Sequence, residues 1–264
     1  MGRIAEKFNE LLAKKEKALI VYLTAGDPSL AITKKLILGL AEAGVDMLEI
    51  GVPFSDPTAD GPVIQEAAQR ALKSGTTLAG VLQLVKEVRQ VSSVPIILFG
   101  YFNPIFAYGV KQFAGTARKA GVDGVLVVDL PFEEAQELRV YTDAAGIDFI
   151  SLISPTTGGE RIRKITAKAR GFLYYISITG ITGTAAPRIA DIKADVEKIR
   201  KISGLPVAVG FGITKPQQAK EIAEFADGIV IGSAVVRLID DHRNDPDLVK
   251  IDADFARKIK KSLS

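Results

Sequence analysis

The residues best suited to acid–base chemistry lie in and just after a short apolar run near position 50. Glu49 interrupts the run Met47–Ile50, and two further acids follow it in a proline-rich loop. Because side chains alternate along a strand, Glu49 points into the fold if its two neighbours pack against helices. A carboxyl group placed there is partly desolvated, which raises its pKa and suits proton transfer. The alternative is a buried glutamate paired with a lysine or arginine.

The loop 52–62 has the composition of a functional segment rather than of a simple connector. Its prolines stiffen it, and it carries Asp56 and Asp60. Either carboxylate could face a site or cap the helix that begins near Pro62. The residue pattern alone leaves both alternatives open.

Glycine-rich turns follow three of the later apolar runs. The first is the segment 177–188, the second is Gly210–Thr214, and the third begins at Gly232 and opens a short helix. Glycine lets the backbone approach a ligand closely, and free amides at a helix N-terminus attract phosphate. The predicted phosphate ligands are the amides of Gly212, Gly232 and Ser233, together with the Ser233 hydroxyl.

Eight short apolar runs alternate with helical patterns along the chain. They are Leu19–Leu23, Met47–Ile50, Ile96–Phe99, Val125–Val128, Phe149–Ile153, Leu173–Ile176, Val207–Gly210 and Ile229–Ile231. Continuous apolar runs are typical of parallel strands covered on both faces. Eight evenly spaced units predict an α/β fold: a (β/α)8 TIM barrel, one domain over residues 1–264, with an extra N-terminal helix and a short phosphate-binding helix after strand eight. A doubly wound sheet is the alternative.

Three similar tetrapeptides precede predicted strands, at Ala43–Asp46, Ala120–Asp123 and Ala145–Asp148. Their glycines suit the left-handed position that ends a helix. They mark the end of a barrel that serves stability, so chemistry is expected at the opposite strand ends.

The composition excludes several kinds of chemistry. The chain has no cysteine and one histidine, His242, which lies in a polar run and is expected on the surface. Thiolate catalysis and a metal site built from histidines are therefore not expected. No lysine ends a predicted strand, which argues against a Schiff base.

The charge pattern indicates neither a nucleic-acid nor a membrane partner. The net charge of +3 is small, and charged residues interrupt every apolar run that could form a signal peptide or span a bilayer. A cytoplasmic location is the expectation.

The segment Leu48–Gln65, LEIGVPFSDPTADGPVIQ, resembles the signature of the tryptophan synthase α-subunit family. Shorter motifs match in the same order, so that the resemblance covers nearly the whole chain: Thr24–Pro28, Tyr101–Ile105, Asp129–Pro131, Gly180–Gly183, Gly210–Ile213 and Gly232–Ala234. The resemblance implies retro-aldol cleavage of indole-3-glycerol phosphate to indole and glyceraldehyde 3-phosphate, with no cofactor. It also implies a partner β-subunit that uses pyridoxal phosphate to make L-tryptophan, in an α2β2 heterotetramer.

The resemblance also assigns roles to individual residues. Glu49 is the principal acid–base group, and Asp60 lies beside the indole N–H, where positive charge develops. The other substrate-binding positions, for the indole, the lid and the phosphate, are Tyr22, Phe99, Tyr174, Thr182, Gly183, Gly212, Gly232 and Ser233. Of these, Thr182 matches the lid residue that positions Asp60. The positions that meet the β-subunit are Pro53, Phe54 and Asp56, so the resemblance gives Asp60 to chemistry and Asp56 to the partner.

One departure from the family is the lid segment Thr184–Arg188, which has few polar groups. It bears on lid closure and on signalling to the β-subunit rather than on the reaction class. Two other functions compete with the lyase. A sugar-phosphate epimerase needs histidine metal ligands and a phosphoribosylanthranilate isomerase a catalytic cysteine, and the sequence supplies neither. A non-catalytic activator of a β partner is disfavoured by the presence of both Glu49 and Asp60.

Overall fold

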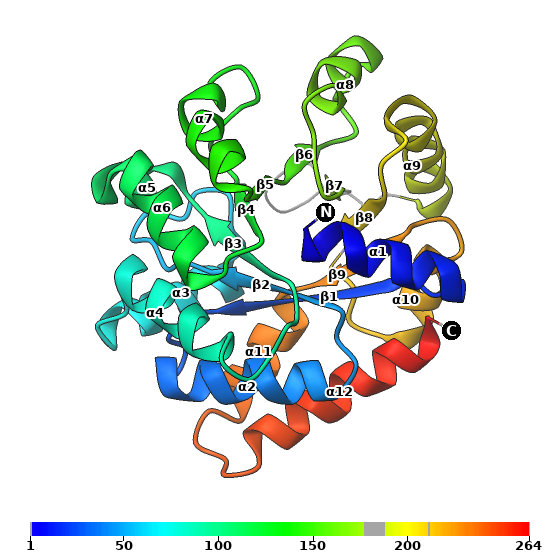
Figure 1. The fold of residues 1–264 in the computed structure, drawn as a ribbon. Coiled ribbons are helices and arrows are strands. Elements are labelled where there is room, and N and C mark those ends of the chain that lie inside the picture. The colour runs from blue at the N-terminus through cyan, green and yellow to red at the C-terminus, as the bar shows by residue number, and fades with distance from the viewer. Residues whose placement is uncertain (1, 177–187, 211, 264) are drawn as a thin grey trace.

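Parallel strands form a nearly closed cylinder with helices outside it (Figure 1). The structure is a computed structural model, and it describes residues 2–176, 188–210 and 212–263. Within these residues there are nine strands: β1 (Ala18–Thr24), β2 (Met47–Gly51), β3 (Ile96–Gly100), β4 (Gly124–Val127), β5 (Asp148–Phe149), β6 (Ser151–Ile153), β7 (Leu173–Ile176), β8 (Val207–Gly210) and β9 (Gly228–Ile231). Their order is β5-β4-β3-β2-β1-β9-β8-β7-β6, with all pairings parallel.

The fifth predicted strand, Phe149–Ile153, is split at Ile150 into β5 and β6. The two pieces are the first and last strands of the sheet, so the chain itself closes the cylinder at this point. The break arises because β5 pairs with β4, as far as Val125 and Phe149, whereas β6 pairs with β7. The expected (β/α)8 barrel is present, and the doubly wound alternative was wrong.

Helices surround the barrel on all sides (Figure 1). Those in the described residues are α1 (Arg3–Lys14), α2 (Leu30–Glu42), α3 (Pro62–Lys73), α4 (Leu78–Val88), α5 (Phe102–Tyr108), α6 (Val110–Ala120), α7 (Gln136–Ala145), α8 (Gly159–Thr166), α9 (Ile189–Ser203), α10 (Pro216–Ala223), α11 (Ser233–Asp241) and α12 (Leu248–Ser262). The expected extra N-terminal helix is α1, and the expected short helix after the last strand is α11. None of these helices is long and apolar enough to cross a membrane.

Apolar side chains fill the barrel interior separately from the layer between strands and helices. The interior cluster includes Ile20, Met47, Ile97, Leu126, Ile150, Ala208 and Val230. Helix α1 closes the end of the barrel at which the strands begin, since Ile4, Phe8 and Leu11 join this cluster. The ring of Phe8 lies 5.5 Å from that of Phe172. Only the opposite end of the barrel is therefore left for a site.

Acidic side chains stabilise the end of the barrel that α1 closes. The carboxylate of Asp46 accepts the Leu19 amide at 2.8 Å and pairs with Lys260 at 2.7 Å. The carboxylate of Asp123 likewise accepts the Ile96 amide and forms an ion pair with Arg89. The glycines of the three repeated turns, at positions 44, 121 and 146, all have positive φ, as the pattern predicted.

Candidate active site

Glu49 points into the barrel from the middle of β2. Its strand neighbours Leu48 and Ile50 belong to the cluster under the helices, whereas Met47, two residues before it, lies in the interior cluster. The residue is 1% exposed, and neither carboxylate oxygen has a hydrogen-bond partner among the residues that the structure describes. Burial raises the pKa of Glu49 to about 8. The group is therefore mostly a neutral acid at pH 7, and no lysine or arginine of the described residues pairs with it.

Aromatic side chains surround Glu49. Tyr22 is aligned with it on β1, and the Tyr22 ring meets the Phe99 ring edge-on at 5.1 Å. Tyr174 joins the interior cluster from β7, whereas Tyr175 faces outward and donates to Asp195 of α9. Burial raises the pKa of both Tyr22 and Tyr174, and the charges of Glu49 and Asp60 add to the effect. The two acids and the two tyrosines therefore lie close enough to one another for their charges to interact.

The backbone of neighbouring strands leaves room for these rings. A Cβ atom added to Gly51 would lie 2.1 Å from the Tyr22 hydroxyl oxygen, and one added to Gly210 would lie 2.5 Å from that of Tyr174. Both contacts are far shorter than a Cβ tolerates, so the glycines at these strand ends make space for the aromatic walls.

Asp60 is held at the barrel mouth by Tyr101, which directly follows β3 and is the N-cap of α5. The Tyr101 hydroxyl donates to Asp60 Oδ2 at 2.9 Å and accepts the Ala59 amide at 2.9 Å. Gln65, on α3, donates to the Asp60 carbonyl at 2.9 Å. Burial raises the pKa of Asp60 to about 6, and the bond from Tyr101 opposes that rise. Asp60 is therefore largely ionised at pH 7.

The first part of the same loop carries Pro53, Phe54 and Asp56. Asp56 is exposed and accepts from Ser55, Phe54 is half-buried with its ring 5.3 Å from that of Tyr101, and Pro53 is buried. Neither aspartate caps α3, whose N-cap is Gly61 without a side-chain bond. The two acids thus lie on different sides of the loop.

The turns after β8 and β9 provide backbone amides at the mouth. Gly212 has a φ of +59°, which favours glycine. Gly232 is the N-cap of α11, and Ser233, the first residue of that helix, is exposed. The amides of a helix's first turn have no intrahelical acceptor, so this end attracts an anion. Thr182 and Gly183, predicted for the lid and the phosphate, lie outside the described residues.

The sequence reasoning missed three positioning side chains. Tyr101 and Gln65 fix the Asp60 loop, and Asp129 accepts the Phe102 amide at 2.8 Å, fixing the start of α5. All three residues lie in the segments that resemble the family motifs, and this resemblance was the signal that could have identified them. Within the residues placed by the structure, no group of three or more histidine, cysteine or acidic residues could hold a metal ion. His242 is partly exposed and near Asp245.

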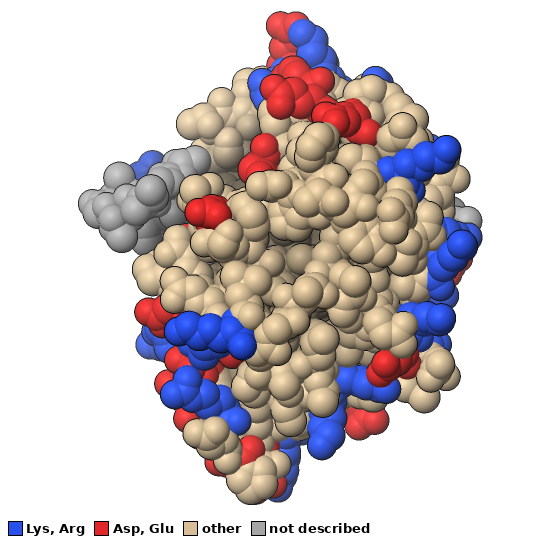
Figure 2. Space-filling view, turned by 90° about the vertical axis from the view of Figure 1, so that its left-hand side faces the viewer, with Lys and Arg blue, Asp and Glu red and all other residues tan. Residues whose placement is uncertain are grey.

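The face that carries the mouth is poor in charge. Figure 2 shows the side toward which β1 and β2 run in Figure 1: its centre is uncharged, and most charged side chains lie at its periphery. Phe106 of α5 is 59% exposed. An uncharged surface around a site is typical of a surface that another protein covers.

Comparisons with known proteins agree with this geometry. The model of the family described as tryptophan synthase alpha chain matches residues 8–263. A tryptophan synthase alpha chain of Geotalea daltonii is 53% identical over 237 residues, 90% of each chain. One of Citrifermentans bemidjiense is 51% identical over 243 residues, covering 92% of this chain and 91% of the relative. The crystal structure of the subunit from Legionella pneumophila has a TM-score of 0.94 and 39% identity, covering 100% and 98%.

The nearly closed parallel barrel, with Glu49 and Asp60 toward the carboxyl ends of its strands, defines the class as a TIM-barrel enzyme. More particularly, the chain belongs to the tryptophan synthase alpha chain family. It is a carbon–carbon lyase that cleaves indole-3-glycerol phosphate to indole, the activity of that family. Members of the family need no cofactor of their own and pair with β-subunits.

Proposed function

We propose that Glu49 is the acid–base group of this cleavage. The observation that carries the proposal is its carboxyl group: buried, unpaired and with a pKa of about 8. A neutral carboxylic acid is able to donate its proton to C3 of the indole ring. The resulting carboxylate then takes the proton of the side-chain hydroxyl while the carbon–carbon bond breaks. The bonding electrons return to the ring, the aldehyde forms, and Glu49 regains its proton.

Asp60 is the electrostatic partner in this proposal. Its pKa of about 6 keeps it ionised at pH 7, when Glu49 is protonated. A carboxylate at the mouth stabilises the positive charge that develops at the indole N–H after C3 is protonated. Two acids whose pKa values are pushed apart by their environments support this division of roles. Tyr22, Phe99 and Tyr174 form the walls against which the indole ring packs.

The phosphate binds, in this proposal, to the amides of Gly212, Gly232 and Ser233 at the start of α11. An exposed helix N-terminus with glycine before it supports that assignment. Thr182 and Gly183 are proposed to complete the site from the segment that follows β7.

The direct test measures indole released from indole-3-glycerol phosphate by the purified chain and by Glu49→Gln. The variant is expected to keep the fold and phosphate binding and to lose about 100-fold or more in turnover, the usual scale for a general acid–base. Near-full activity of Glu49→Gln would end the assignment. Glu66→Gln, an exposed acid on α3, is the matched control and should leave turnover unchanged.

Pro53, Phe54 and Asp56, together with the mostly uncharged surface seen in Figure 2, are proposed as the docking surface for a β-subunit, in an α2β2 heterotetramer. Phe106 of α5, which is 59% exposed, is an apolar side chain that such a partner would cover. Pyridoxal phosphate belongs to that partner. Mixing the chain with a purified β-subunit and measuring the mass of the complex tests the stoichiometry. One domain over residues 1–264 and a cytoplasmic location stay predictions.

A further inference from the structure

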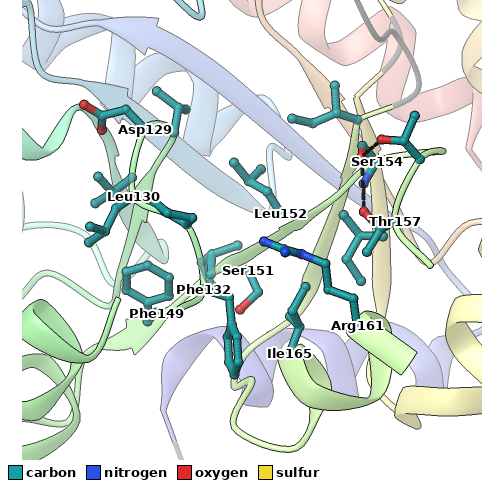
Figure 3. A pocket seen from close by; sticks show the side chains of 17 residues that line it. Asp129, Leu130, Phe132, Phe149, Ser151, Leu152, Ser154, Thr157, Arg161 and Ile165 are labelled. Carbon is teal, nitrogen blue, oxygen red and sulfur yellow. Dashed lines mark hydrogen bonds between the residues drawn. The ribbon is translucent and has the colours of Figure 1, made fainter. Parts of the chain in front are cut away.

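A pocket of about 570 Å³ opens where the barrel wall changes from β5 to β6 (Figure 3). Beyond Val125 and Phe149 no strand pairing joins β4 to the next piece of chain in the described structure, because β6 pairs with β7 instead. The helices that follow these strands, α7 and α8, diverge at the same place (Figure 1). The volume lies in the range of small-molecule sites.

The pocket is separate from the acid–base site. Its lining comes from the end of β4, the loop after it, β5, β6 and α8, and includes neither Glu49 nor Asp60 nor Ser233. Its inner wall contains Val128 and Leu152, which pack against the interior cluster. It therefore backs onto the barrel interior and opens toward the outside.

Most of the lining is apolar and partly aromatic. Leu130, Phe132, Phe149 and Ile165 surround the cavity from three different segments, which are the loop after β4, β5 and α8. Two phenyl rings at one cavity favour a flat aromatic guest, because aromatic pairs contribute contact energy beyond burial of their area.

One buried polar group in this apolar lining has no partner. Ser151 is 5% exposed, and its Oγ has no hydrogen-bond partner among the residues that the structure places. Figure 3 shows this hydroxyl in the cavity between Phe132 and Ile165. A buried hydroxyl without a partner is unfavourable, so a guest that bonds to it recovers that loss.

The charged residues at the two ends of the pocket indicate the charge of the ligand and its orientation. The Arg161 side chain is 49% exposed and uses Nη2 to donate to Glu133 at 2.8 Å. A guanidinium has five N–H donors, so several stay available to an anion. Asp129 lies at the other end, where its carboxylate accepts the Phe102 amide. A carboxylate is thus attracted toward Arg161 and repelled from Asp129.

We propose that this pocket, at the break between β5 and β6, is a second ligand site that binds a small aryl carboxylate. The aromatic ring packs between Phe132 and Phe149, a polar group bonds to Ser151 Oγ, and the carboxylate meets the Arg161 guanidinium. The inference does not depend on the roles proposed for Glu49 and Asp60.

The test uses 4-fluorophenylacetate as the probe and follows its fluorine NMR signal during titration of the full chain. Saturable broadening is expected. Arg161→Gln should weaken binding about tenfold or more, the scale of one charge-assisted hydrogen bond. Glu133→Gln should strengthen it, because it removes a competing carboxylate. Arg163→Gln, an exposed arginine of α8 outside the lining, is the matched control and should change nothing.

A second variant, Ser151→Ala, distinguishes a ligand site from a cavity that only reflects imperfect packing. Ser151→Ala removes an unpaired buried hydroxyl, so the fold should be as stable as before or more so, yet the probe should bind more weakly. Arg161→Gln should release indole at the wild-type rate. Equal affinity of the wild type, Arg161→Gln and Ser151→Ala would overturn the proposal. So would purely competitive inhibition of indole release by the probe, which would place it in the substrate site.

Discussion

The Tyr101 hydroxyl and the Asp60 carboxylate are hydrogen-bonded at 2.9 Å across the mouth of the barrel. The bond connects the end of β3 to the loop after β2, and it favours the ionised form of Asp60. Burial raises the pKa of Asp60 to about 6, and without this donor the rise would be greater. A side chain that follows a different strand therefore limits the rise that burial causes in the pKa of Asp60.

Removal of that hydroxyl should move the acidic limb of the pH profile. In Tyr101→Phe the charged form of Asp60 loses a donor, so the pKa of Asp60 rises and the limb of kcat/KM shifts to higher pH. Indole release measured between about pH 5 and about pH 9 checks this. Asp60→Asn is the control, since it should abolish the limb. A limb that persists in Asp60→Asn would belong to another group, such as the substrate phosphate.

The alkaline limb should report Glu49. Its pKa of about 8 means that the proton needed at indole C3 is lost above that pH. The value of kcat/KM is therefore expected to fall about tenfold for each pH unit beyond it, as for any essential acid. The profile of kcat/KM, which reports the pKa values of the free enzyme, is the measurement. A plateau reaching about pH 10 would contradict the role of Glu49 as proton donor.

Local patterns allowed much of the fold to be predicted. Helical patterns were expected between the apolar runs, and α4 covers one of them, in which Leu78, Val81, Leu82, Val85 and Val88 recur at helical spacing. Strand alternation was enough to orient Glu49, because its neighbours are unmistakably apolar. The break at Ile150 was not predicted, since Phe149–Ile153 is one apolar run and the switch of pairing partner is a tertiary event.

The contacts that position Asp60 and the surroundings of Glu49 could not be predicted from the sequence. Tyr101 and Asp60 are 41 residues apart, and nothing in either segment specifies that their side chains meet. The partnerless state of Glu49 is equally invisible in the sequence, because it depends on every side chain packed around it. The sequence therefore identifies the candidate reacting groups more readily than the neighbouring groups that shift their pKa values.

A negative charge at the start of α11 should weaken substrate binding. Ser233→Asp places a carboxylate where the phosphate is proposed to bind, so repulsion should raise KM about tenfold or more, while kcat changes less. Steady-state kinetics of indole release give both constants. Ser92→Asp adds the same charge before β3, at the closed end of the barrel, and should leave KM unchanged. Equal effects of the two substitutions would argue for a general charge effect and against the site.

Loss of the outward-facing acid should affect the partner and not the chemistry. Asp56→Ala is expected to weaken binding of a β-subunit in calorimetric titration, while indole release by the isolated chain stays unchanged. Glu42→Ala, an exposed acid near the closed end of the barrel, serves as the control. Unchanged affinity of Asp56→Ala would remove this part of the loop from the docking surface.

A buried acid on α12 should make the fold less stable as pH rises. Asp252 is completely buried, neither carboxylate oxygen has a hydrogen-bond partner in the part of the chain that the structure describes, and burial raises its pKa to about 7. Between the ordinary pKa of an aspartate, about 4, and about 7, the unfolded chain has lost this proton while the folded chain keeps it. The free energy of unfolding therefore falls by up to about 1.4 kcal/mol for each pH unit in this window.

Asp252→Leu should remove that penalty. The variant is expected to gain more stability over the wild type at pH 8 than at pH 4.5, by about 2–4 kcal/mol. Urea unfolding at the two pH values measures the difference. Asp254→Asn, on the exposed side of the same helix, loses only a surface ion pair with Arg257 and should show almost no pH-dependent change. A gain for Asp252→Leu that is equal at both pH values would mean that Asp252 is ionised in the folded chain.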